Sequence, residues 1–257
     1  MFITVGDTKI YATAFGPTTA PVIVGIGGWI GSWELWVEPF SILSQKWRTI
    51  AYDHRGAGAT VAPVESITHD RLVDDVLAVL DAYEVESCVL AAESAGALTA
   101  YGAALKYPKR ITGLVIVDGI VFRATPPEKD FFLMGLREAY PAVLDRFVET
   151  CVPEPGSDHI KRWGRQIIDR ASQAAALALY LSAGEVDLRE ELRHVFQSTL
   201  ILHGEADGIV PVSEARRLAE ILPNAKLSVL PGAGHVPTLT RPLEVAQEIM
   251  NFFGSNV

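Results

Sequence analysis

Residues 88–97 read CVLAAESAGA, an apolar run that ends in a serine flanked by small residues. The run has the composition of a buried strand, and the alanine- and leucine-rich residues 95–106 favour a helix that stops before Pro108. Ser94 therefore stands where a strand turns directly into a helix. Such a sharp turn requires small residues two positions before and after it, here Ala92 and Gly96. The alternative interpretation is that Ser94 has only a structural role, as the N-cap of the helix.

Short apolar runs alternate with segments of helical periodicity on both sides of this stretch. In one of those segments, Thr68 is placed to cap a helix and Asp70 falls in its positively polarised first turn. The alternation predicts an α/β fold, a mostly parallel central sheet with helices on both faces. The expected strands span residues 21–25, 48–52, 87–92, 113–117, 199–203 and 227–230.

The alternation fails in the middle of the chain. From about Val121 to Gln197 several helical stretches are broken by prolines, and strands and helices then resume at residues 199–203, 212–222, 227–230 and 241–253. We therefore expect one domain, built from residues 1–120 and 198–257, that is interrupted by a helical cap of residues 121–197. Aromatic residues of the cap either pack onto the core or line a pocket beneath it.

Composition argues against several classes of protein. The 257 residues include 22 basic and 31 acidic side chains, a net charge of −9, and no block of lysine or arginine. Nucleic acid and anionic membrane surfaces are therefore not expected partners. No signal peptide or membrane span is visible, and Cys88 and Cys151 fit neither a disulfide framework nor a zinc site. These features favour a cytoplasmic protein. The sequence does not indicate its oligomeric state.

Two further loops that follow expected strands carry an acid and a histidine. Asp207 lies after residues 199–203, and His235 lies after residues 227–230. A serine hydroxyl is a weak nucleophile near pH 7, so it needs an imidazole to take its proton and a carboxylate to orient that imidazole. We expect Ser94, His235 and Asp207 to take these roles. Asp118 is the second candidate for the acid, and Glu205 is a further rival.

The chain resembles the α/β-hydrolase superfamily, in particular its lid-bearing bacterial carboxylesterases and lactonases. The resemblance rests on Ser94, Asp207 and His235 in that order, with the serine in a turn like the family's G-x-S-x-G nucleophile elbow. Residues 53–60, DHRGAGAT, resemble the family's D-x-R-G-x-G-x-S turn, and residues 234–237 with Pro242 resemble the stretch around its histidine. The likeness covers essentially the whole chain.

The resemblance also implies an oxyanion hole, the pair of donors that binds the negative oxygen of the transition state. The family usually has His-Gly-x in an early glycine-rich loop, and this chain has Gly27, Gly28 and Trp29 there. By similarity, the backbone N–H groups of Trp29 and Ala95 would be the two donors.

The resemblance implies that the protein is a serine hydrolase, which cleaves a carboxylic ester or lactone through an acyl-enzyme. A pocket walled by Gly28, Trp33 and Val236 would favour a small, uncharged, largely apolar substrate. No cofactor or metal is expected, because P-loop and H-E-x-x-H strings are missing and Ile30 interrupts the one glycine-rich dinucleotide pattern. The alternatives are a carbon–carbon bond hydrolase, another cofactor-free enzyme with the same triad, or a ligand sensor with a hydrolase fold.

Two sets of polar residues receive structural interpretations. Glu93, beside the serine, is expected to be a buried group paired behind the sheet. The histidines assigned to turns, exposed helices or strand ends are His54, His69, His159, His194 and His203.

Overall fold

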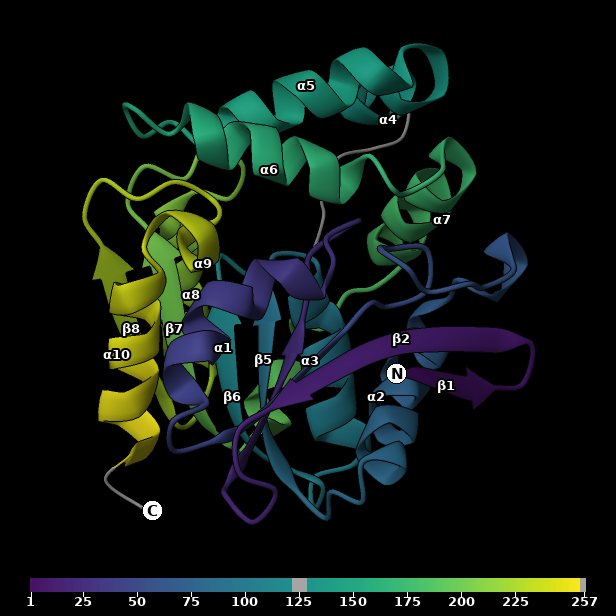
Figure 1. The fold of residues 1–257 in the computed structure, drawn as a ribbon. Helices are drawn as coiled ribbons and strands as arrows, with labels where there is room; N and C mark the ends of the chain where they lie inside the picture. The colour runs from purple at the N-terminus through teal and green to yellow at the C-terminus, as the bar shows by residue number, and fades with distance from the viewer. Residues whose placement is uncertain (122–128, 255–257) are drawn as a thin grey trace.

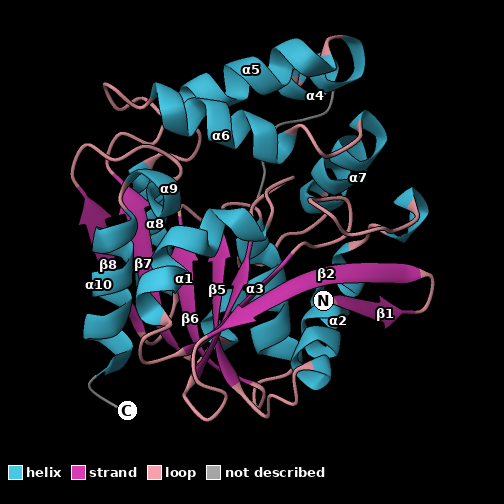
Figure 2. Cartoon of the chain, in the orientation of Figure 1, coloured by secondary structure: helices cyan, strands magenta, loops and turns pink. Residues whose placement is uncertain are grey.

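The computed structural model describes residues 1–121 and 129–254. Within them, eight strands form one sheet in the order β1-β2-β4-β3-β5-β6-β7-β8 (Figures 1 and 2). Strand β2 runs antiparallel to β1 and β4, and all other neighbouring pairs are parallel. The strands are β1 (Phe2–Val5), β2 (Thr8–Phe15), β3 (Val22–Ile26), β4 (Arg48–Tyr52), β5 (Cys88–Glu93), β6 (Ile111–Val117), β7 (Ser198–Gly204) and β8 (Ala225–Leu230). The predicted fold class is confirmed.

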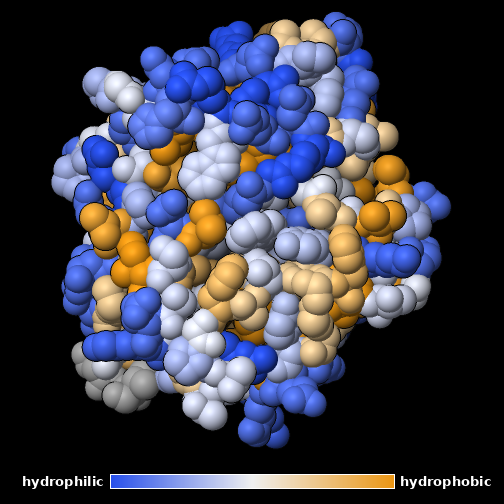
Figure 3. Space-filling view, viewed as in Figure 1, coloured by the Kyte–Doolittle hydropathy of each residue, from blue (hydrophilic) through white to orange (hydrophobic). Residues whose placement is uncertain are grey.

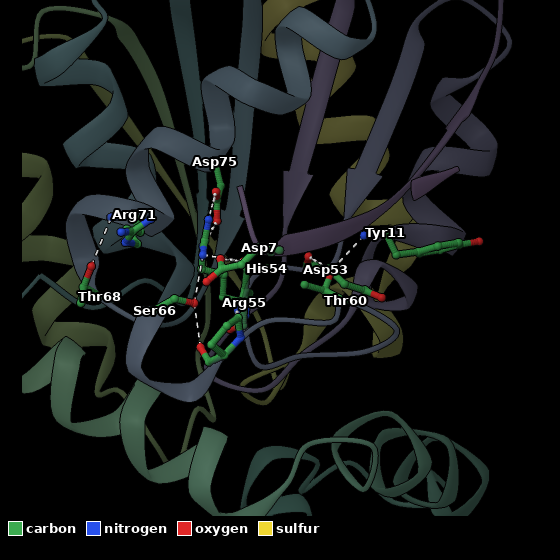
Figure 4. Close-up of polar contacts among 12 residues, drawn as sticks. Asp7, Tyr11, Asp53, His54, Arg55, Thr60, Ser66, Thr68, Arg71 and Asp75 are labelled. Carbon is green, nitrogen blue, oxygen red and sulfur yellow. Dashed lines mark hydrogen bonds and ion pairs between the residues drawn. The ribbon is translucent and has the colours of Figure 1, made fainter. Parts of the chain in front are cut away.

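Helices lie on both faces of this sheet, as expected. The residue before α2 is its N-cap: the Thr68 hydroxyl accepts a hydrogen bond from the N–H of Arg71 at 3.4 Å (Figure 4). The α-helices are α1 (Val37–Leu43), α2 (His69–Ala82), α3 (Gly96–Lys106), α4 (Phe131–Glu138), α5 (Tyr140–Cys151), α6 (Asp158–Ile168), α7 (Gln173–Gly184), α8 (Val212–Ile221), α9 (Pro237–Thr240) and α10 (Pro242–Phe253).

Two apolar cores separate the sheet from its helices. Successive side chains of a strand point to opposite faces, so Val115 and Val117 of β6 join one core while Leu114 and Ile116 join the other. The first core contains apolar residues of α1 and α10, and the second contains those of α2, α3 and α8. Burial on both faces explains why the central strands are almost wholly apolar.

Helices α4 to α7 lie above the carboxyl ends of the parallel strands (Figure 1). Apolar side chains of α5 and α6, among them Leu144, Val148 and Ile167, are buried, whereas the outer surface of these two helices is mainly hydrophilic (Figure 3). These helices fall inside the predicted cap. Residues 122–128, at its start, lie outside the described residues, and the boundaries of the cap stay a prediction.

The chain turns sharply after β4, and an ion pair holds this turn against α2. The guanidinium of Arg55 donates two hydrogen bonds to the carboxylate of Asp75, at 2.6 and 2.8 Å, and two more to the hydroxyls of Thr8 and Ser66 (Figure 4). Arg55 is 1% exposed, so its guanidinium is shielded from water and is hydrogen-bonded to these protein groups instead. The turn is therefore a fixed part of the fold.

Both cysteines, Cys88 and Cys151, are free and buried, as the sequence suggests. Among the helices of residues 1–121 and 129–254, none combines the length and the apolar character that crossing a bilayer requires.

Candidate active site

Ser94 occupies the turn between β5 and α3 in a strained backbone conformation. Its φ is +50°, in the left-handed region that residues with a side chain rarely adopt. The turn is tight: a Cβ built on Gly96 would lie 2.5 Å from the carbonyl oxygen of Gly27. The backbone N–H of Ser94 donates to the carbonyl oxygen of Val117 at 2.9 Å. The side chain is consequently held at the carboxyl end of the sheet, where it stays partly exposed.

The three side chains expected to act together lie in one chain of hydrogen bonds. Nε2 of His235 is 2.9 Å from the Ser94 hydroxyl oxygen, and Nδ1 of His235 is 2.7 Å from a carboxylate oxygen of Asp207. The other oxygen of Asp207 accepts from the backbone N–H groups of Ile209 and Val210, at 2.7 and 2.9 Å. Residues from three distant loops therefore meet with the geometry that primes a serine for attack.

Asp118, the second candidate acid, lies beside Asp207 rather than in its place. It is fully buried with φ +47°, and one of its oxygens accepts from the N–H of Gly204 at 2.8 Å. Burial, together with the negative charge of Asp207, raises the pKa of Asp118 well above its ordinary value. Burial and the neighbouring Asp207 thus both favour the protonated form of Asp118.

Asp207 keeps its negative charge in the same surroundings. Burial acts to raise its pKa, but the hydrogen bond and positive charge of His235 and the two backbone donors outweigh burial, so the pKa is lowered. An ionised Asp207 can stabilise a positive charge on the adjacent His235 ring. Of the two acids, Asp207 alone contacts His235.

Glu93, the residue before the serine, is a second buried acid at the site. It is 1% exposed, and one of its oxygens accepts a hydrogen bond from the hydroxyl of Thr238 at 3.1 Å. Its other oxygen finds no partner among the described residues. Burial is the main cause that raises the pKa of Glu93 from 4.5 to about 8. The carboxyl group therefore holds its proton at neutral pH.

Trp29, one of the two expected oxyanion donors, lies between the serine and the helices above it. The neighbouring Gly28 contacts the elbow so closely that a Cβ built there would be 3.0 Å from Cβ of Ser94. The Trp29 indole donates from Nε1 to the carbonyl oxygen of Ala176 in α7 at 2.8 Å. Its ring packs edge-on against Phe132 and Phe147 of α4 and α5. The other expected donor, Ala95, is the first residue after the serine and lines a hollow together with Trp29.

A cavity of about 60 Å³ lies in front of Ser94 and His235. Gly28 and Val236, both expected to line a pocket, are among its walls, and apolar side chains of α5 and α6 close it from above. Trp33 does not line this cavity; it borders a separate hollow beside β2 and α1, so we leave it out of the pocket. Its apolar walls suit an uncharged ligand.

One group of side chains near the site has the composition of a metal site. Ligand atoms of Asp118, His203 and Asp207 lie within 4.8 Å of one another. Asp207 is bound to His235 and to two backbone N–H groups, and Nε2 of His203 lies 2.9 Å from the carbonyl oxygen of Val210. Nδ1 of His203 and one oxygen of Asp118 have no hydrogen-bond partner among the described residues. We assign no metal to it.

His54 is a residue near the site whose surroundings the sequence does not reveal. It is 5% exposed, and Nε2 of its ring is 2.9 Å from the carbonyl oxygen of Gly28, in the loop that faces the serine. Its place in the D-x-R-G turn is the only sequence signal, because this contact joins residues 26 positions apart.

Comparison with known proteins agrees with this geometry. The family described as alpha/beta hydrolase fold matches residues 21–163, more than half of the chain. The protein named "Putative carbamate hydrolase RutD" of Caulobacter sp. (strain K31) is 28% identical over 251 residues, which cover 91% of this chain and 90% of that protein. The 3-oxoadipate enol-lactonase 2 of Acinetobacter baylyi is 22% identical, with coverage of 93% and 91%. An esterase from Exiguobacterium antarcticum has the same fold, with 21% identity, a TM-score of 0.91 and coverage of 98% of both chains. The chain belongs to the alpha/beta hydrolase fold family.

Proposed function

We propose that the protein is a serine hydrolase that cleaves a carboxylic ester or lactone through an acyl-enzyme on Ser94. The observation that carries the proposal is the continuous chain of hydrogen bonds from Ser94 through His235 to an ionised Asp207. The relatives named as an esterase and an enol-lactonase support this class of substrate. We also propose that the protein acts in the cytoplasm.

In the first half of the reaction, the Ser94 hydroxyl oxygen attacks the carbonyl carbon of the substrate. Its proton passes to Nε2 of His235, and Asp207 stabilises the resulting imidazolium. The carbonyl oxygen becomes an oxyanion, which would accept hydrogen bonds from the backbone N–H groups of Trp29 and Ala95. When the bond to the leaving oxygen breaks, His235 gives that oxygen the proton, and the acyl group stays on Ser94.

In the second half, water replaces the alcohol. His235 takes a proton from a water molecule as its oxygen attacks the acyl carbon, and a second oxyanion forms at the same donors. Breakdown of this intermediate returns the proton to Ser94 and releases the acid. One ester and one water thus give one acid and one alcohol, or one hydroxy acid from a lactone.

The cavity in front of Ser94 narrows the substrate class. Its walls carry the side chains of Phe147, Val148 and Ile167, which favour an uncharged, largely apolar group on the carbonyl. The helices that supply these walls belong to the predicted cap, residues 121–197, which we propose as the roof of the site. A carbamate is the second candidate substrate, because the relative from Caulobacter is named as a carbamate hydrolase and the same attack on a carbonyl would cleave it.

The test compares the wild-type protein with S94A on a panel of substrates. The panel contains p-nitrophenyl esters of graded acyl length, lactones of matching length and an N-alkyl carbamate. We expect ester or lactone turnover that falls about 10⁴-fold or more in S94A, while the circular dichroism spectrum and melting temperature stay close to those of the wild type. Turnover that survives in S94A would contradict the mechanism.

Covalent labelling gives an independent readout. A fluorophosphonate should add to Ser94 in the wild-type protein and not in S94A, as mass spectrometry of the peptide would show. Turnover confined to the carbamate would select the second candidate. Labelling without turnover of any panel member would favour a different reaction, such as carbon–carbon bond cleavage, or a sensor role.

A further inference from the structure

Both ring nitrogens of His54 face backbone carbonyl oxygens. Nδ1 lies 3.0 Å from the oxygen of Arg55, and Nε2 lies 2.9 Å from the oxygen of Gly28. A carbonyl oxygen can only accept a hydrogen bond, and a neutral imidazole carries hydrogen on one of its two nitrogens, so the tautomer decides which contact is a hydrogen bond. The contact through Nδ1 is local, whereas the contact through Nε2 joins the turn after β4 to the glycine-rich loop after β3. Only the tautomer with hydrogen on Nε2 links His54 to the loop that faces the serine.

The Gly28 carbonyl belongs to the same peptide unit as the N–H of Trp29. A peptide unit is planar and trans, so its C=O and N–H point in opposite directions, and a bond that fixes the first also fixes the second. The Gly28 oxygen also accepts from the N–H of Gly31 at 3.1 Å. Because Gly27 and Gly28 have no side chain, the backbone beside this peptide has more freedom than elsewhere, and the loop depends on such bonds for its orientation.

His54 is itself held in place on both sides. Arg55 makes the buried ion pair with Asp75, and Asp53 accepts hydrogen bonds from the N–H groups of Trp33 and Ala59, both at 2.7 Å. Figure 4 shows His54 in this turn, between Asp53 and Arg55. The turn thus contacts the segment after β3 at two points: His54 contacts Gly28 in the glycine-rich loop, and Asp53 accepts from the N–H of Trp33 just beyond that loop. A donor on so rigid a support can set the angle of a peptide.

We propose that His54 is a positioning residue for the oxyanion hole: its Nε2–H holds the Gly28–Trp29 peptide so that the N–H of Trp29 faces the carbonyl oxygen of the substrate. This inference rests on the proposed function. His54 acts through the peptide and does not touch the reacting atoms. Residue 27, where the family usually has a histidine, is glycine in this chain and offers no side chain to hold the loop.

Two substitutions of His54 separate the roles of its ring nitrogens. In H54Q the side-chain amide reaches about as far as Nε2 and can still donate to Gly28, whereas in H54N the shorter side chain places its amide near the position of Nδ1. The matched control is H159N, which alters an exposed histidine of α6. Each variant is assayed on the best ester of the panel, with its melting temperature.

We expect kcat to fall about 10- to 100-fold in H54N and to recover most of that loss in H54Q, because a donor displaced by about 1 Å costs up to about 10²-fold. KM should change little, since the oxyanion exists only in the transition state. A trifluoromethyl ketone, which adds to the serine and forms an oxyanion, should lose affinity in H54N by the same factor as kcat. The corresponding alcohol should bind all variants alike, and H159N should match the wild type.

Equal losses in H54N and H54Q, or a loss of ketone and alcohol binding together, would mean that His54 only stabilises the fold. If the wild-type protein turned over no ester and bound no ketone, the proposed function would fail, and nuclear magnetic resonance would decide the role of His54 alone. A slowly exchanging Nε2–H in the wild type, with a Trp29 amide signal that shifts in H54N and not in H54Q, supports the contact. A wild-type ring without hydrogen on Nε2 overturns it.

Discussion

Replacement of Glu93 by glutamine should change how the stability of the protein depends on pH. Glu93 is 1% exposed, and burial is the main cause that raises its pKa from 4.5 to about 8. The folded protein therefore keeps a proton on Glu93 that the unfolded chain releases above pH 4.5. Glutamine has nearly the same shape, can accept the hydrogen bond from Thr238, and carries no ionisable proton.

The sign and size of the effect follow from this difference. The folded state binds more protons than the unfolded state between pH 4.5 and pH 8, so stability falls as pH rises through that range. The full span of 3.5 pH units corresponds to about 5 kcal/mol at about 1.4 kcal/mol per unit. E93Q lacks this loss. Relative to the wild type, its free energy of unfolding should gain about 1 kcal/mol from this cause at pH 5 and about 4 kcal/mol at pH 8.

Urea unfolding at a series of pH values between 5 and 8 measures this gain as the difference between E93Q and the wild type. The other titrating groups, including Asp118, remain in both proteins and largely cancel in the difference. The control is E65Q, at an exposed position, whose difference from the wild type should stay constant with pH. A difference between E93Q and the wild type that is independent of pH, or that shrinks towards pH 8, would refute the reasoning.

Two other predictions concern the acid beside the histidine and the turn after β4. D207N should lower kcat about 10⁴-fold, because asparagine favours the wrong tautomer of His235. D118N should cost less than about 10-fold, because Asp118 accepts from the N–H of Gly204 rather than bonding to His235, and asparagine can still accept that bond; equal losses in ester turnover would contradict the assignment of Asp207. R55M should lower the free energy of unfolding by about 3 to 5 kcal/mol, because it leaves the buried carboxylate of Asp75 unpaired, and R55M/D75N should recover part of this loss in urea unfolding. A double variant as unstable as R55M would contradict this explanation.

The central strands could be predicted because burial on both faces makes them continuous apolar runs. The expected strand at residues 48–52 matches β4 residue for residue, and the other expected strands differ from the observed ones by one or two residues at their ends. Neither β1 nor β2 is among the expected strands. The side chains of β2 alternate between buried and more exposed positions, and β2 lies antiparallel near the edge of the sheet, so Thr8–Phe15 carries no apolar run.

That Ser94, Asp207 and His235 lie together could be predicted, because each follows a strand whose carboxyl end lies at the same edge of the sheet. The surroundings of the two other buried acids, Glu93 and Asp118, could not be predicted. That Glu93 contacts Thr238, 145 residues away, and that Asp118 lies against Asp207 rather than His235 depend on how loops pack, for which local sequence has no signal. The same holds for the contact between His54 and Gly28.

Trp29 belongs to two layers of the molecule at once. Its backbone lies in the loop that faces the serine, while its indole is bonded to α7 and packed between α4 and α5. A substrate that enters by displacing α7 must break the indole's bond to Ala176 or move the loop with it. If the N–H of Trp29 binds the oxyanion as proposed, any displacement of α7 and the orientation of that N–H are therefore coupled through the indole.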